Sequence, residues 1–433
     1  MTTPPDRVAQ PDTLSDGISG ELLSAIRERF HHVEQCPYTG KRVFFENAGG
    51  SLTLKAVVQR VAEIAAVPDN AHRDNDASRA IEQRVEDGRE ALREFFGAED
   101  GVIISGETGS ECLFRLIRAA ATAAAEGGSI VACELEHPSS FDGTAQWARR
   151  TGREWLTVPF DTSSGRVTAE HYARVVRADT RVASILHTSP VTGMAQDVAA
   201  IAAAIRAVAP DCYIIVDGIQ HAPHGDIDVA DYGVDGYVVS MYKTFCHFNN
   251  GYAWLSPRLS RVDHDRLLGK PDDAWELGSR DPAAFAAVSE MVDYLAWLGG
   301  HFSEATSRRE RLLAAARAMH AQEIALTTRV IHGTENLDGL ARLPGVRLIG
   351  EADSPWREGV VSFAVEGRDA VEIVARLDEH GIRVHARKDD TFSGNILRPL
   401  GLPSVTRISL AHYNTFDEVD QCLAALKEIL AAR

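Results

Sequence analysis

The chain has 433 residues, more than one typical hydrophobic core accommodates, so we expect a large and a small domain. Hydrophobic residues make up 45% and charged residues 25% of it, as in ordinary soluble globular proteins. The formal net charge of −17 argues against nucleic acid or an anionic membrane as the main partner.

The cysteines and the N-terminal residues argue against further classes of protein. The six cysteines are scattered, with no C-x-x-C pair, so we predict neither a metal site nor a disulfide framework. Residues 1–18 are polar and lack the apolar segment of a signal peptide, so we expect a disordered tail and a cytoplasmic location. No apolar run reaches membrane-spanning length, so no membrane partner is expected.

The first ordered elements are predicted from apolar periodicity and turn residues. Residues 19–40 should form a helical lead-in and residues 41–281 the large domain. A strand at 42–46 leads into a glycine-containing turn at 47–51 and then a helix at 52–65. Asn47 lies in that turn, where asparagine tolerates unusual backbone conformations.

A strand at 102–105 is followed by a turn of small residues and a long helix. The free N–H groups and the dipole of a helix N-terminus favour an anion, so Thr108, Gly109 and Ser110 are candidates for binding phosphate. Ordinary N-capping by Thr108 or Ser110 would use the same groups, and this alternative stays open.

Further strands are predicted at 129–135, 154–159 and 182–187, and a helix at 195–208. The first of these strands leads directly into Glu136 and His137. A histidine at a strand end is often only structural, so the pattern by itself assigns His137 no function.

The stretch from Tyr213 to Lys243 carries the strongest chemical signal. One apolar run ends in Asp217, with Gln220 three residues later, and a second run ends in Ser240, just before Lys243. Such runs read as parallel strands that bring their terminal side chains to one edge of a sheet. A lysine amine can form a Schiff base with an aldehyde, and a carboxylate can keep a pyridine nitrogen protonated. The pair therefore suits an aldehyde cofactor with a basic ring nitrogen.

The remaining residues, 282–433, are predicted to form linking helices and a small C-terminal domain. A helix should run from 282 to about 328, followed by strands at 346–349, 359–365, 382–386 and 405–410 and helices at 369–380 and 416–431. Strands with helices on one side indicate a compact α+β unit. Residues 385–389 include three basic side chains, which are either solvated or able to bind an extra acidic group of a substrate.

The D-x-x-Q pattern followed by S-x-Y-K resembles the class V aminotransferase superfamily of pyridoxal-phosphate enzymes, which includes cysteine desulfurases and isopenicillin-N-epimerase-like proteins. The resemblance runs from about Arg42 to the C-terminus. It implies the α/β fold of fold-type I pyridoxal-phosphate-dependent transferases. In this fold a large domain with a mostly parallel seven-stranded sheet is joined to a small α+β C-terminal domain.

The resemblance also implies roles for matched residues. Lys243 would carry the cofactor, Asp217 would pair with its ring nitrogen and Gln220 would contact its phenolic oxygen. The ring of His137 would stack on the pyridine. The phosphate would be bound by Thr108, Gly109, Ser110, Ser240 and Tyr242, the last of which replaces a histidine of the family pattern.

Three further matches concern the substrate and a second subunit. Arg407 would bind the α-carboxylate of an amino-acid substrate, because its planar guanidinium makes two parallel hydrogen bonds. Asn47 would line the mouth of the active site. Ser279 would reach the cofactor phosphate of a neighbouring subunit, which implies a homodimer with shared sites; the alternative is an N-cap ahead of the next helix.

Two departures from the family pattern bear on the reaction. Pro190 replaces an asparagine and offers no side-chain donor. Residues 382–400 contain no cysteine, although desulfurases carry their nucleophilic cysteine in this loop, so persulfide formation is not expected. We therefore expect a pyridoxal-phosphate enzyme that performs β-elimination, as a C–S lyase on a cysteine conjugate. Transamination, epimerisation, decarboxylation-coupled deamination and a cofactor-binding protein without turnover are the alternatives.

Overall fold

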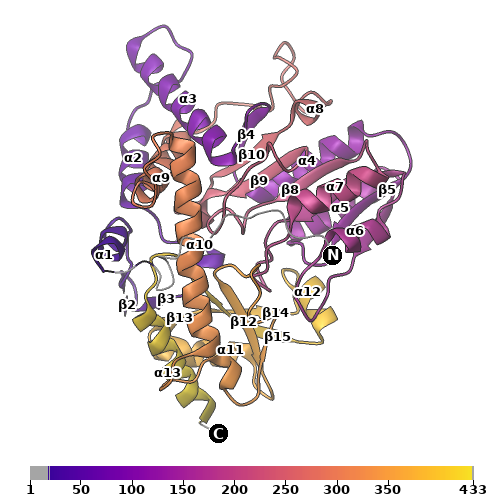
Figure 1. The fold of residues 1–433 in the computed structure, drawn as a ribbon. Helices are drawn as coiled ribbons and strands as arrows, with labels where there is room; N and C mark the ends of the chain where they lie inside the picture. The colour runs from indigo at the N-terminus through magenta and orange to yellow at the C-terminus, as the bar shows by residue number, and fades with distance from the viewer. Residues whose placement is uncertain (1–17, 19, 432–433) are drawn as a thin grey trace.

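The computed structural model describes residue 18 and residues 20–431, so the tail predicted at 1–18 lies almost entirely outside the described residues. Two sheets dominate the structure, with the larger one above and the smaller one below in Figure 1. The long helix α10, Arg308–His332, runs between them from α9, Pro282–Gly299. Within these described residues, no helix combines the length and apolar character that a membrane span requires.

The large sheet has seven strands in the order β4-β10-β9-β8-β7-β5-β6. β10 runs antiparallel to both of its neighbours, whereas β9, β8, β7, β5 and β6 are mutually parallel. The mostly parallel seven-stranded sheet predicted from the sequence is thus confirmed. Its strands are β4 Val102–Gly106, β5 Ser129–Cys133, β6 Glu154–Val158, β7 Thr180–Leu186, β8 Tyr213–Asp217, β9 Gly236–Ser240 and β10 Gly251–Leu255.

Helices cover both faces of this sheet, so its strands are apolar on both sides. In β8, Ile214 and Val216 pack into one hydrophobic cluster, while Ile215 packs into the cluster on the opposite face. The helices attached to the large sheet are α4 Gly109–Ala123, α5 Pro138–Arg150, α6 Ala169–Val175, α7 Val198–Val208 and α8 Pro257–Ser260.

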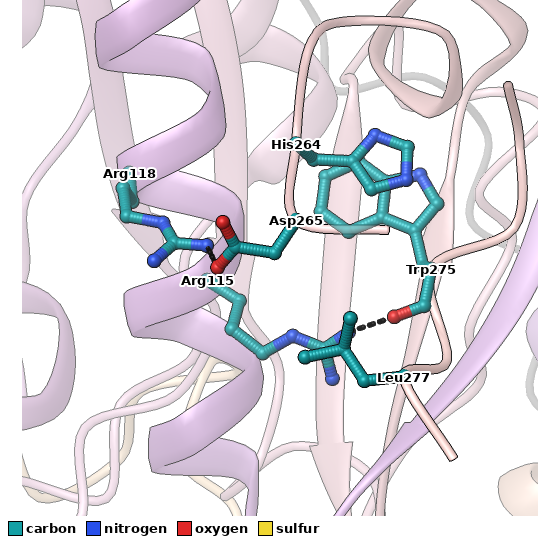
Figure 2. A pocket seen from close by; sticks show the side chains of 6 residues that line it. All are labelled: Arg115, Arg118, His264, Asp265, Trp275 and Leu277. Atoms are coloured by element: carbon teal, nitrogen blue, oxygen red, sulfur yellow. Dashed lines mark hydrogen bonds and ion pairs between the residues drawn. The ribbon is translucent and has the colours of Figure 1, made fainter. Parts of the chain in front are cut away.

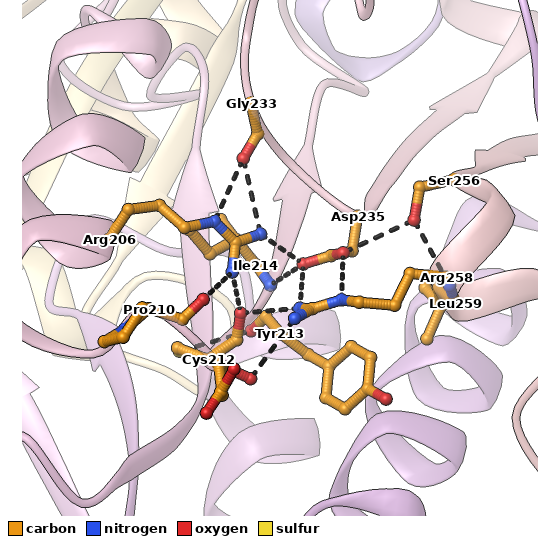
Figure 3. A network of polar contacts seen from close by, with 11 residues as sticks. Arg206, Pro210, Cys212, Tyr213, Ile214, Gly233, Asp235, Ser256, Arg258 and Leu259 are labelled. Atoms are coloured by element: carbon orange, nitrogen blue, oxygen red, sulfur yellow. Dashed lines mark hydrogen bonds and ion pairs between the residues drawn. The ribbon is translucent and has the colours of Figure 1, made fainter.

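The amino-terminal ends of β8 and β9 are fastened by a buried carboxylate (Figure 3). Asp235 accepts hydrogen bonds from Arg206 Nη2 at 2.7 Å, from Arg258 Nε at 2.9 Å and from the Ile214 N–H at 2.9 Å. These contacts fix β8 and β9 at their amino-terminal ends. Asp217 and Ser240 lie at the carboxyl ends of the same two strands.

The N-terminal segment and the helices before and after the large sheet pack together. Their bounds are α1 Gly20–Glu28, β1 Gln35–Cys36, β2 Gly40–Lys41, β3 Val43–Phe44, α2 Lys55–Ala65 and α3 Asp76–Phe96. α2, α3 and α10 all contact α9. The sequence predicted one helix from 282 to about 328, but the chain turns at Gly299 and Gly300 and starts α10 eight residues later.

The small sheet is antiparallel in the order β11-β12-β15-β14, with α10, α11 and α13 around a separate apolar core. Val43 and Phe45 belong to this second core, and β3 pairs with β13. The predicted domain boundaries at 40/41 and 281/282 stay predictions. The elements are β11 Val346–Leu348, β12 Val360–Val365, α11 Ala370–Glu379, β13 Ile382–Arg383, β14 His385–Lys388, α12 Gly394–Leu400, β15 Ser404–Ser409 and α13 Phe416–Ala431.

Candidate active site

Lys243 and Asp217 meet at the carboxyl edge of the large sheet, as the sequence predicted. Asp217 is the last residue of β8, and Lys243 closes the 3-10 turn Met241–Lys243 directly after β9. Lys243 Nζ donates a hydrogen bond to Gln220 Oε1 at 3.1 Å. All three side chains are buried, with at most 8% of each residue exposed.

Burial changes the proton affinity of both charged groups. It lowers the pKa of Lys243, and the nearby charge of Arg407 lowers it further, whereas Asp217 acts in the opposite direction. Burial raises the pKa of Asp217, although the Ile219 N–H, at 3.1 Å, and Lys243 favour its charged form. A buried amine with reduced proton affinity is able to act as a nucleophile or a base.

Helix α4 begins beside the end of β9. Thr108 is its N-cap, with Oγ1 accepting from the Glu111 N–H at 3.0 Å, so the capping alternative is present. The Gly109 N–H donates to Ser240 Oγ at 2.9 Å. A Cβ at Gly109 would lie 2.5 Å from that oxygen, so only glycine permits this approach. The start of the helix dipole therefore lies at the same edge as Lys243, with Ser110 in its first turn.

His137 lies between β5 and α5, where its Nδ1 accepts the Ser139 N–H at 3.2 Å and caps the helix. Burial and the positive charges of Lys243 and Arg387 lower the pKa of His137 to about 3. The imidazole is therefore neutral near pH 7, and a flat neutral ring can stack on an aromatic cofactor.

Arg407 lies on β15, is 1% exposed and reaches the loop that follows β7 of the large sheet. Its Nη1 donates to the carbonyl of Pro190 at 3.0 Å, while its Nε has no hydrogen-bond partner among the described residues. The main-chain carbonyl of Pro190 therefore orients the guanidinium. Burial lowers the pKa of Arg407 to about 9, and the charge of Arg387 contributes.

Asn47 is buried inside the protein, whereas Ser279 lies at its surface. Asn47 is 4% exposed, and its amide donates to Ser409 O at 2.8 Å and accepts from the Tyr413 hydroxyl. Its polar atoms are thus engaged within the protein, and we do not carry it forward as a substrate ligand. Ser279 is exposed in the loop before α9, and its contact with a second subunit stays a prediction.

Tyr242 precedes Lys243 in the turn after β9, and its ring packs against neighbouring residues. The ring stacks on Phe248 with centroids 4.6 Å apart and planes at 14°. A Cβ at Gly50 would lie 3.3 Å from the Tyr242 ring, and the Ser51 N–H donates to the Tyr242 carbonyl at 3.1 Å. The turn at 47–51 therefore positions Tyr242.

A buried polar chain behind Gln220 was not assigned any role from the sequence. Gln220 Nε2 lies 3.0 Å from His224 Nε2, and His224 Nδ1 lies 2.8 Å from Glu323 Oε2 on α10. All three residues are at most 2% exposed. Glu323 is 99 residues from His224 in the chain, so the sequence does not reveal that they pair. The only sign of this polar chain in the sequence was a histidine four residues after Gln220.

A separate small pocket of about 110 Å³ lies beside α4 (Figure 2). Arg118 is paired there with Asp265, and Arg115 points to the Trp275 carbonyl. The ring of His264 stacks on Trp275 at 4.1 Å. Because both arginines are already engaged by the protein, this pocket carries no function in our account.

The family model described as aminotransferase class-V matches residues 43–251 and 311–422. The chain belongs to this family. Pyridoxal phosphate is the cofactor of the class V aminotransferases and of this chain.

Relatives of the class V aminotransferase chain include an aminotransferase-like protein, FGM3, of Gibberella zeae, which is 28% identical over 94% of this chain and 98% of its own length. A probable cysteine desulfurase of Halobacterium salinarum is 28% identical over 94% of this chain and 96% of its own. The apo structure of a cysteine desulfurase from Thermococcus onnurineus superimposes with a TM-score of 0.79 at 20% identity, covering 94% and 99% of the two chains. The last comparison bears on the fold alone.

The donor set at the edge of the large sheet fits pyridoxal phosphate. A buried lysine of lowered pKa suits the aldehyde, a buried carboxylate suits the ring nitrogen, and a neutral imidazole suits the ring face. The glycine-dependent start of α4 suits the phosphate. These are the chemical groups that this cofactor requires, gathered from β5, α4, β8 and β9.

Proposed function

We propose that this class V chain is a pyridoxal-phosphate-dependent lyase that cleaves the C–S bond of a cysteine S-conjugate by β-elimination. The observation that carries this proposal is the lack of a cysteine in and around the loop between β14 and α12. Residues 382–400 contain no cysteine. The aromatic side chain of this loop, Phe392, lies with its ring centroid 6.3 Å from that of His137. Sulfur therefore meets no thiolate acceptor there and is released with its substituent.

The cysteines elsewhere support the same proposal. Burial raises the pKa of Cys112, Cys133, Cys212, Cys246 and Cys422, so these thiols are poor nucleophiles. Cys36 has a pKa lowered to about 7 by hydrogen bonds with Thr39 and Tyr38, but it lies on the short strand β1 near the N-terminus. It serves below as a control for persulfide chemistry.

We assign the chain's residues as follows. When bound, pyridoxal phosphate supplies an aldehyde for the substrate amine and a protonated ring that withdraws electrons from Cα. Asp217 holds the proton on the ring nitrogen, Gln220 orients the phenolic oxygen and His137 covers one ring face. The phosphate is held by Thr108, Gly109, Ser110, Ser240 and Tyr242, and Ser279 reaches it from the partner subunit of a homodimer.

Arg407 positions the substrate by binding its α-carboxylate. Lys243 Nζ then takes the Cα proton, which its lowered pKa permits near neutral pH. The C–S bond breaks with its electron pair on sulfur, so a thiol is released. Water converts the remaining three-carbon fragment to pyruvate and ammonia.

The test is to incubate the holoenzyme with a panel of cysteine S-conjugates and to measure pyruvate, ammonia and thiol. Equal amounts of all three products are expected, with no protein-bound persulfide and unchanged rates in Cys36→Ser. A persulfide on Cys36 would favour a desulfurase instead. Transfer of the amine to a keto acid without thiol release would favour an aminotransferase, and Cα exchange with solvent as the only event would favour an epimerase. Release of carbon dioxide would favour decarboxylation-coupled deamination.

A further inference from the structure

Two arginines lie side by side on the face of the small sheet that faces the large domain. In the antiparallel pair β14–β15, His385 is opposite Arg407 and Arg387 is opposite Val405. Residues directly opposite share a face, as do residues two apart on one strand, so Arg387 and Arg407 share a face. As diagonal neighbours their Cβ atoms are about 7 Å apart.

Neither guanidinium has a carboxylate within ion-pair distance in the described part of the chain. Arg387 donates to Ser393 Oγ at 2.7 Å and to the Phe392 carbonyl at 2.9 Å, both neutral acceptors. Among the described residues, Arg407 donates to the Pro190 carbonyl alone. The nearby carboxylate of Glu46 pairs with other side chains instead. Its Oε2 lies 2.9 Å from Arg383 Nε, and its Oε1 lies 3.2 Å from His385 Nδ1.

The buried arginines that serve structure alone look different. Arg153 and Arg357 also have no carboxylate within ion-pair distance in residues 20–431, but each donates to four main-chain carbonyls. Two neighbouring arginines with so few acceptors repel each other unless an anion lies between or beside them. The arrangement is therefore suited to a ligand with two acidic groups.

Arg387 also lies next to the reacting groups. Its Nη2 holds the main chain of Phe392, whose ring is near that of His137. Its positive charge contributes to the lowered pKa of Lys243, of His137 and of Arg407. An acidic group on the substrate side chain would thus reach Arg387 while its α-carboxylate is on Arg407.

We propose that Arg387 binds an anionic group carried by the sulfur substituent of the substrate, so that the natural conjugates are dicarboxylic or comparably acidic. This inference rests on the proposed function and narrows its substrate class. The guanidinium makes two parallel hydrogen bonds to a carboxylate, which a neutral amide of the same shape cannot accept equally well.

Two nearly isosteric substrates separate charge from shape: S-carboxymethyl-L-cysteine and S-carbamoylmethyl-L-cysteine. The wild-type holoenzyme should favour the carboxymethyl substrate by about tenfold or more in kcat/KM, as expected for a charge-assisted hydrogen bond. Arg387→Met should bring the ratio of the two kcat/KM values close to one, whatever its effect on each value alone, and Arg387→Lys should keep part of the preference. Lys388→Met removes the adjacent, exposed cation and should retain the preference.

Binding without turnover provides a second readout. Calorimetric titration of cofactor-loaded Lys243→Ala with both compounds should show tighter binding of the carboxymethyl form, and adding Arg387→Met should abolish the difference. Equal binding of the two compounds, no binding of either, or an equal loss for both in Arg387→Met would overturn the subsite. If the charge preference in binding is present but no pyruvate is formed by the wild type, the lyase proposal fails and the subsite stands.

Discussion

Lys243 Nζ donates to Gln220 Oε1 over 3.1 Å, which joins the turn after β9 to the loop after β8. The other end of the Gln220 amide contacts His224, which is itself bound to Glu323 on α10. The orientation of the amide beside the lysine is thus fixed from the helix that links the two sheets. The carboxyl edge of the large sheet and helix α10 are therefore joined by one continuous chain of hydrogen bonds.

Replacing His224 by Leu should destabilise the protein strongly. It leaves the buried Glu323 carboxyl without its hydrogen-bond donor, and an unsatisfied buried polar group costs about 1–3 kcal/mol of unfolding free energy, more when the group is charged. Lys427→Met, which removes an exposed partner of Asp338, should cost no more than about 1 kcal/mol. Urea unfolding of both variants checks this, and equal midpoints would show that the buried chain contributes nothing to stability.

Asp217→Asn should lower kcat about 100-fold or more while the cofactor stays bound. The amide cannot hold the ring nitrogen protonated, so stabilisation of the charge that develops at Cα is lost. Steady-state rates together with the cofactor content of the purified variant test this. A fully loaded variant with wild-type kcat would remove Asp217 from the mechanism.

Arg407→Lys should raise KM for amino-acid substrates about 10- to 100-fold, because a bidentate charge-assisted hydrogen bond is replaced by a point charge. Arg357→Lys is the matched control. Arg357 is buried and donates to main-chain carbonyls such as those of Thr192 and Glu351, so this variant should lose thermal stability with little change in KM. The reverse pattern in the two variants would contradict the assignment of Arg407.

The free energy of unfolding should decrease as the pH is lowered below about 6.5. His412 should account for part of this pH dependence. Burial lowers its pKa from 6.5 to about 3, and its Nε2 lies 2.5 Å from the Tyr294 hydroxyl in an aromatic environment. Its pKa is depressed on folding, so between pH 6.5 and 3 the unfolded chain binds a proton that the folded chain does not. Each such histidine contributes a slope of about 1.4 kcal/mol per pH unit.

His412→Phe removes this titrating group and should flatten the pH dependence of the unfolding free energy. His137, whose pKa is also lowered to about 3, contributes a similar slope that remains in the variant. Urea titrations of the cofactor-free protein from pH 7 to pH 4 give the slope directly. An unchanged slope in His412→Phe would mean that the imidazole is not the group that titrates.

The sequence predicted the elements whose apolar residues follow a regular pattern within a single strand or helix. The apolar runs before Asp217 and Ser240 gave both buried strands and the common edge at which their side chains meet. α5 was not predicted, although its Pro138 stands at a favoured first helical position. The expected long helix after Pro282 was broken where α9 and α10 pack closely at Gly299.

The features that the sequence did not predict depend on contacts between distant segments. The engaged amide of Asn47 requires Ser409 and Tyr413 from the far end of the chain. The position of Arg387 follows from the register of β14 against β15, which a run of basic residues does not reveal.

The most direct test of the account is borohydride reduction of the cofactor-loaded protein followed by peptide mass spectrometry. The account requires the reduced cofactor on Lys243, with no labelling and no visible cofactor absorbance in the reduced Lys243→Ala protein. Labelling of a different lysine, or a colourless wild-type protein after addition of pyridoxal phosphate, would contradict it.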